Sequence, residues 1–154
     1  MGNIIAFSGA CLAVLLACIG SAKGVGMAGE AGSGLLAEDP SHFSRVLMLQ
    51  LMPGTQGLYG FIIWFFAFFV KMGASFSPEM TVAQGLFIFA ACMPIAFGGL
   101  ISAIYQGRVS CSAMGIIAKH PDGIGNAMSL VIMVEFYAII PFLSSLLLLI
   151  MVNF

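Results

Sequence analysis

Charged residues are scarce in this chain. Of its 154 residues, five are Lys or Arg and six are Asp or Glu, together 7%, whereas 61% are hydrophobic. A water-soluble domain carries about 25% charged residues, so the composition excludes a soluble enzyme. The net charge of −1 provides no basic surface for phosphate groups, and we expect no nucleic-acid partner.

The chain also lacks the residue groupings that carry catalysis. Its four cysteines form no Cys-x-x-Cys pair, and no nucleophile–base pair or metal-binding cluster occurs outside the apolar stretches. The segment Gly24 to Gly29 matches G-x-G-x-x-G, but that motif binds dinucleotides only after a strand in a soluble domain. We therefore expect no catalytic site in this chain and no organic cofactor.

Apolar stretches make up most of the chain. A transmembrane helix needs about 20 apolar residues, and four stretches meet that length: Ile4 to Ala22, Val46 to Val70, Met80 to Gly107 and Ile124 to Phe154. Turn-forming residues separate them, namely Glu38-Asp39-Pro40, Ser75 to Pro78 and Lys119-His120-Pro121. The sequence predicts an all-α membrane protein with four transmembrane helices.

The two halves of the chain resemble each other. A shift of 81 residues superimposes turn and small residues without gaps, among them Ala37 on Ala118, Pro40 on Pro121, Gly26 on Gly107 and Met52 on Met133. We interpret this as a duplicated antiparallel helical hairpin. Residues 1–73 form the first hairpin and residues 79–154 the second.

Basic residues predict the orientation in the membrane. Toward the two hairpin turns lie Lys23, Arg45, Arg108 and Lys119, and toward the other side lies Lys71. The positive-inside rule then predicts a multi-pass protein of the cell membrane with cytoplasmic hairpin turns and both termini outside. Lys23 is near the depth of the polar cluster described below, which indicates helices that project beyond the bilayer at the turns. His42 and His120, also at the turns, are expected to be solvated or to contact a partner.

Small residues recur on the first helix. Gly20, Gly24, Ala28 and Gly32 are four residues apart, and such a stripe lets helices approach closely in lipid. The second helix instead ends in the bulky run Phe61 to Phe69, which is typical of a lipid-facing surface. We expect the first helix to lie inside an assembly and the second outside.

Glu135 is the candidate functional residue. It is the only charged residue after Asp122, and a charge at the bilayer centre costs at least about 2.5–3.5 kcal/mol. A carboxyl kept protonated for packing alone is the alternative. Counted from the prolines of the hairpin turns, three polar residues lie at the same depth, about 21–24 Å along their helices: Thr55, Gln56 and Gln106.

Helix 2 presents its polar residues on one face. Met52, Thr55, Gln56 and Tyr59 follow helical spacing, and the adjacent Pro53 frees a backbone carbonyl that needs a partner in lipid. Oxygen ligands suit hard cations, and one carboxylate balances one positive charge. A proton alone would not need so many neutral oxygens, so the pattern favours Na⁺ over H⁺. The loaded site is then neutral and can face lipid, whereas the empty ionised site cannot.

Three segments carry a family resemblance: Pro53 to Gly60, Gln106-Gly107 and Glu135 to Ala138. They resemble the proteolipid (K or c) subunit of bacterial V-type rotary ATPases, closest to the sodium-pumping branch. The resemblance covers essentially the whole chain, including Gly20 to Met27.

The resemblance implies a ring of identical subunits in membrane lipid. The ring would rotate against a stator subunit that carries an arginine, driven through a central stalk subunit by a soluble ATPase head. It implies these Na⁺ ligands: Thr55, Gln56, Gln106, Glu135 and the backbone carbonyl of Met52. Tyr59 would hydrogen-bond the carboxylate. Met52 replaces the expected Leu, and Gly54 occupies the position that matches Glu135, which leaves one ion for two hairpins.

Three alternatives remain at this point. The ring could be proton-driven, with the Gln and Thr side chains as structural hydrogen-bonding groups. The chain could be a self-contained antiporter or channel that uses Glu135 as its relay. A purely structural membrane scaffold would leave Glu135 without a role.

Overall fold

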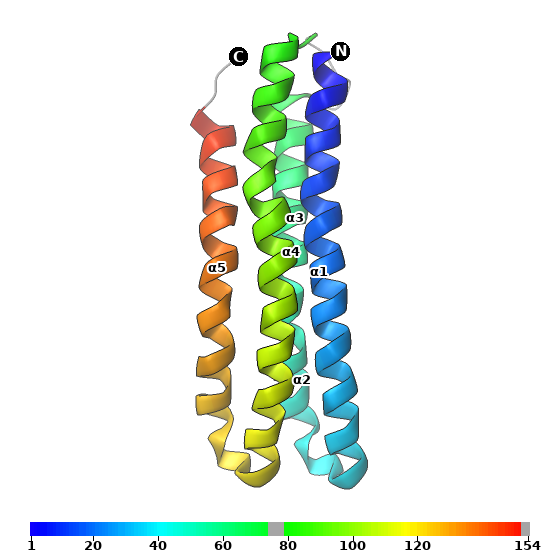
Figure 1. Cartoon of the computed structure of the whole chain (residues 1–154), viewed down its shortest axis with the longest axis vertical. Helices are drawn as coiled ribbons and strands as arrows, with labels where there is room; N and C mark the ends of the chain where they lie inside the picture. The colour runs from blue at the N-terminus through cyan, green and yellow to red at the C-terminus, as the bar shows by residue number, and fades with distance from the viewer. Residues whose placement is uncertain (74–78, 152–154) are drawn as a thin grey trace.

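The computed structural model describes residues 1–73 and 79–151, which form four long, side-by-side helical rods (Figure 1). The predicted turn at Ser75 to Pro78 lies outside the described residues. The first rod is α1 (Gly2–Glu38) and the third is α4 (Val82–Lys119). The second comprises η1 (Pro40–His42), α2 (Phe43–Leu51), η2 (Met52–Gly54), α3 (Thr55–Phe65) and η3 (Phe66–Lys71). The fourth comprises η4 (Pro121–Gly123) and α5 (Ile124–Met151).

The four predicted helices are present, and α1 and α4 end at the predicted turn sequences, beyond the ends of their apolar stretches. The first helix continues past Ala22 to Glu38, and the third continues past Gly107 to Lys119. At 1.5 Å per residue the 37 residues of α1 extend about 55 Å, well beyond a hydrocarbon core of about 30 Å. The apolar stretch predicts which part of α1 lies in lipid, and the helix continues beyond that stretch to the turn.

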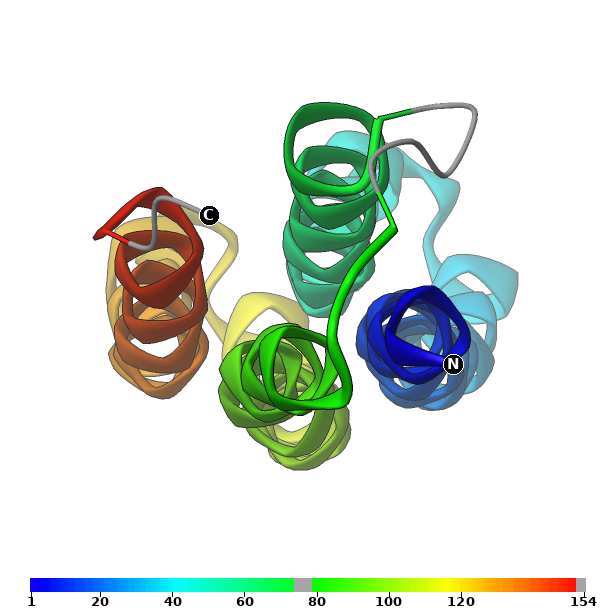
Figure 2. The ribbon, with the colours of Figure 1, turned by 90° about the horizontal axis from the view of Figure 1, so that it is seen from above.

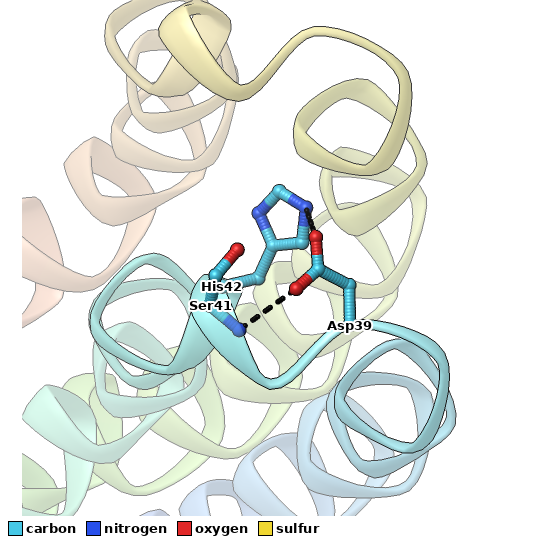
Figure 3. Close-up of polar contacts among 3 residues, drawn as sticks. All are labelled: Asp39, Ser41 and His42. Atoms are coloured by element: carbon cyan, nitrogen blue, oxygen red, sulfur yellow. Dashed lines mark hydrogen bonds and ion pairs between the residues drawn. The ribbon is translucent and has the colours of Figure 1, made fainter.

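The turn between the first two rods is held by Asp39 (Figure 3). Its carboxylate accepts a 2.9 Å hydrogen bond from the backbone N–H of Ser41 and lies 3.4 Å from His42 Nε2. The Ser41 N–H holds the pKa of Asp39 below its ordinary value of 3.8. His42 is only 4% exposed, so its interpretation as a solvated loop residue is wrong, whereas His120 is exposed.

The glycines on α1 bring it into backbone contact with α4. A Cβ added at Gly20 would lie 2.6 Å from the carbonyl oxygen of Leu100, and one at Gly24 would lie 2.4 Å from that of Ala103. The α2–α3 rod packs against α1, and α5 packs against α4 on the side away from α1 (Figure 2). The predicted small-residue stripe is therefore a close helix–helix contact. The outer surface of α3 exposes Phe61 and Phe65, as expected for lipid.

Candidate functional site

The site is built on an interruption of the second rod. Pro53 has no N–H to donate, and the chain makes a short 3₁₀ turn at η2 before α3 begins at Thr55. The first rod supports the interruption, because the Ser21 hydroxyl accepts a 2.8 Å hydrogen bond from the backbone N–H of Gly57. Ser21 was not predicted as part of the site. Its only sequence signal is the repeat, in which Ser21-Ala22 matches Ser102-Ala103.

Glu135 of α5 points toward this interruption and is 7% exposed. The Thr55 hydroxyl lies 2.8 Å from its Oε1 and 3.0 Å from its Oε2. Tyr59 Oη donates to Oε1 at 2.7 Å. The carboxylate is thus embedded in side-chain contacts although it lies in an apolar helix.

Two amide side chains complete the surroundings of the carboxylate. Gln106 Nε2 of α4 donates to Glu135 Oε2 at 2.8 Å and to the Val131 carbonyl at 3.2 Å. Gln56 Nε2 donates to Gln106 Oε1 at 2.6 Å and to Glu135 Oε2 at 3.2 Å. Both glutamines are fully buried, and Gln56 Oε1 has no hydrogen-bond partner among the residues that the structure describes. An unpartnered buried carbonyl oxygen costs free energy unless a donor or a cation reaches it.

The Met52 carbonyl lies beside the carboxylate. The Thr55 hydroxyl is 3.0 Å from this oxygen and within 3.0 Å of both Glu135 oxygens. A hydroxyl has one proton, so it cannot donate to all three at once, and its lone pairs remain close to negative oxygens. All six predicted site residues are thus brought together: Met52, Thr55, Gln56, Tyr59, Gln106 and Glu135.

The cluster places neutral oxygen-bearing side chains around one carboxylate, a donor set that suits a small hard cation. In the part of the chain that the structure describes, every side chain that donates to Glu135 is neutral. The same residues contain no group of three or more His, Cys, Asp or Glu side chains that could hold a metal ion, so a transition-metal site is not indicated. A proton or one monovalent cation would neutralise the cluster. Lys23 is exposed on α1 and is not among the described residues that bond Glu135.

Comparison with known proteins gives two kinds of match. The model of the ATP synthase C family matches residues 8–67 and again residues 89–148. The second match begins and ends 81 residues after the first, which is the shift predicted from the sequence. The duplication is therefore confirmed.

Two relatives are similar over nearly the whole chain. The V-type sodium ATPase subunit K of Enterococcus hirae is 45% identical over 147 residues, 96% of this chain and 91% of the relative. The A-type ATP synthase subunit K of Methanocaldococcus jannaschii is 37% identical over 142 residues, 92% of this chain and 60% of the relative. With its four membrane-spanning helices and its two matched repeats, the chain is an integral membrane protein that belongs to the ATP synthase C family.

Proposed function

We propose that this chain is the ion-carrying rotor-ring subunit of a V-type ATPase membrane sector. It binds Na⁺ at Glu135 and carries the ion across the membrane as the ring rotates, coupled to ATP hydrolysis or synthesis in a separate soluble head. The name of the Enterococcus hirae relative, a V-type sodium ATPase subunit, supports both the kind of ATPase and the ion.

The observation that carries the proposal is the composition of the buried cluster. Glu135 is 7% exposed and contacts four neutral side chains, while the carbonyl oxygen of Gln56 is buried without a partner. A buried carboxylate without a counter-charge costs several kcal/mol, on the order of 3–5. Na⁺ removes that cost and gives the unpartnered oxygen a role.

The ligands to Na⁺ would all be oxygens. They are the carboxylate of Glu135, the hydroxyl of Thr55, the side-chain carbonyls of Gln56 and Gln106 and the backbone carbonyl of Met52. Tyr59 keeps its hydrogen bond to Glu135 and holds the carboxylate in place. A single carboxylate balances one positive charge, so the loaded site is neutral and passes through lipid at low cost.

The empty site is charged, so its exposure to lipid is costly. Without Na⁺, the ionised Glu135 is stable only beside a polar or positive neighbour, which a stator subunit with an arginine would provide. Ions then exchange at the stator and nowhere else, and rotation becomes transport. The hairpin turns, residues 38–42 and 119–123, face the cytoplasm in this proposal, where the central stalk subunit would engage the ring.

Each chain carries one ion in this proposal. The first hairpin, residues 1–73, has Gly54 at the position that matches Glu135, which lies in the second hairpin, residues 79–154. A ring with one ion per two hairpins moves fewer ions per turn. More ATP energy is then available for each ion, which suits transport against a steep gradient.

Reconstitution tests the rotor assignment. Vesicles that contain only this chain should show no Na⁺ flux, and vesicles that contain the complete ATPase should accumulate radioactive Na⁺ on addition of ATP. Glu135→Gln should abolish that uptake. Passive flux through the chain alone that is lost in Glu135→Gln would contradict the proposal and identify a channel or antiporter.

A further inference from the structure

We propose that an open surface on the second hairpin binds the first hairpin of another copy of this chain, with Tyr105 of one copy packed over Gly26 of the next. This inference rests on the proposed rotor ring and specifies how its subunits meet. We call the open surface the α4–α5 hollow. It is lined by Gly98, Ile101, Ser102, Tyr105, Val134 and Tyr137.

The α4–α5 hollow is apolar and uncovered in the single chain. It encloses about 390 Å³, and Tyr137 is 71% exposed and Tyr105 54% exposed beside it. Within residues 1–73 and 79–151 neither phenol forms a hydrogen bond, although Arg108 lies over the Tyr105 ring at 5.1 Å. In the bilayer such a surface is covered either by lipid or by a neighbouring helix, and the internal repeat distinguishes the two.

The internal repeat identifies that partner. Subtracting 81 from the six lining positions gives a matching set on the first hairpin: Ala17, Gly20, Ser21, Gly24, Pro53 and Gln56. All six are buried, and several touch the second hairpin of the same chain directly. Gly24 approaches the backbone of Ala103, and Gln56 bonds Gln106 and Glu135. The surface that is closed inside the chain on the first hairpin is open on the second.

The complementary surface is open on the first hairpin. Inside the chain, the first hairpin contacts Leu100, Ala103 and Gly107 of α4, whose repeat counterparts on α1 are Ile19, Ala22 and Gly26. All three counterparts are exposed. A Cβ added at Gly26 would meet no atom within 4 Å.

The two open surfaces fit in size. Inside the chain Gly24 opposes Gly107, with a Cβ on Gly107 only 2.5 Å from Gly24 Cα. Between copies the corresponding pair is Tyr105 and Gly26, so an aromatic ring meets a position without a side chain. The helices of two copies are therefore farther apart at this contact than the helices within one chain, and the Tyr105 side chain fills the space between them.

The repeat also explains why this second interface carries no ion. In place of Gln56 it has Tyr137, in place of Gln106 it has Val25, and in place of Glu135 it has Gly54. At this second interface, the oxygen ligands are thus replaced by the apolar residues Val25 and Gly54 and by the aromatic side chain of Tyr137. Because the two surfaces differ, copies join head to tail, and a closing rotation produces a ring.

Cross-linking tests the register of this contact. In a chain whose native cysteines are replaced by Ala, the pair Gly26→Cys and Tyr105→Cys should give covalent multimers with a short bifunctional thiol cross-linker. The pair Gly26→Cys and Phe97→Cys should not, because Phe97, also exposed, lies about 12 Å along the helix from Tyr105. The pair Ala17→Cys and Gly99→Cys should link within one chain, since their Cβ positions are 3.1 Å apart.

A second variant does not depend on cross-linking. Gly26→Trp adds bulk where the chain itself has open space, so the subunit should fold but fail to form rings on gel filtration in detergent. Protection of Glu135 by Na⁺ should remain in that monomer, because the ion site lies within one chain. Multimers that persist in Gly26→Trp, or equal cross-linking of the Phe97 pair, would overturn the contact. Loss of Na⁺ protection in the unmodified protein would instead overturn the proposed function.

Discussion

Tyr59 Oη donates a 2.7 Å hydrogen bond to Glu135 Oε1, and the Tyr59 ring stacks on Phe142 with ring centres 5.0 Å apart. Tyr59 thus holds the Glu135 carboxylate with its hydroxyl group, and its ring packs against the same helix, α5. The two contributions can be separated by removing the hydroxyl alone.

Tyr59→Phe should weaken Na⁺ binding and leave the fold intact. Because Tyr59 donates to Glu135 without Na⁺ and keeps this bond in the loaded site, its hydroxyl acts by holding the carboxylate in position, and its loss should lower the affinity by about tenfold. Radioactive Na⁺ binding to the purified protein measures the change. Ser144→Ala is the matched control, because the Ser144 hydroxyl donates to the Ile140 carbonyl of its own helix. Equal Na⁺ affinities of Tyr59→Phe and the wild-type protein would show that Tyr59 does not contribute to Na⁺ binding.

The contribution of Thr55 to Na⁺ binding should come from its hydroxyl group and not from its shape. Thr55→Val keeps the volume and removes the oxygen that lies near Met52 and Glu135, so Na⁺ affinity should fall about 10- to 100-fold. Thr55→Ser restores the hydroxyl and should bind within about threefold of wild type. Calorimetric titration with Na⁺ compares the two. Similar binding by the Val and Ser variants would show that the hydroxyl is not a ligand.

The contact between α1 and α4 should tolerate no added methyl group at Gly24. A Cβ there would be 2.4 Å from the Ala103 carbonyl oxygen, so Gly24→Ala should lower the free energy of unfolding by about 1–3 kcal/mol. Gly34→Ala has no atom within 4 Å of the new Cβ and should raise it by up to about 1 kcal/mol. Thermal unfolding in detergent, followed by circular dichroism, distinguishes them. A Gly24→Ala protein as stable as Gly34→Ala would refute the close contact.

The turn at Asp39 predicts a pH dependence of stability. The Ser41 N–H lowers the pKa of Asp39 in the folded chain, so ionised Asp39 stabilises the fold above its ordinary pKa of 3.8, and this contribution is lost as the pH falls below it. Asp39→Asn should therefore unfold at a lower temperature than wild type at pH 7, and the difference should shrink toward pH 3. A difference that grows in acid would contradict the role of the Ser41 hydrogen bond.

The residues of the site could be predicted because the bilayer limits the possibilities. A single charge in an apolar helix must have partners, and counting from Pro40 and Pro121 placed Thr55, Gln56 and Gln106 near Glu135. The sequence does not encode which amide atom faces the carboxylate. The unpartnered oxygen of Gln56 was therefore a finding of the structure, as was the support from Ser21.

The helix ends could be predicted from the turn sequences, because Pro40 and Pro121 follow the last residues of α1 and α4 closely. Hydropathy predicts only the part of a helix that lies in lipid, and both helices continue through polar residues to the turns. Burial of His42 was not predicted. A turn sequence predicts solvent exposure, and only the packing of four rods shows that this side chain lies inside.

Reaction of Glu135 with a hydrophobic carbodiimide, which modifies the protonated carboxyl, tests the central claim most directly. Na⁺ should protect Glu135 in the purified protein, and Gln106→Ala should need at least about tenfold more Na⁺ for the same protection. Labelling that varies with pH but not with Na⁺ would contradict the sodium site and indicate a proton-carrying ring. If Glu135 is not labelled under any condition, it is not a reactive carboxyl within the membrane, and the proposed ion site is contradicted.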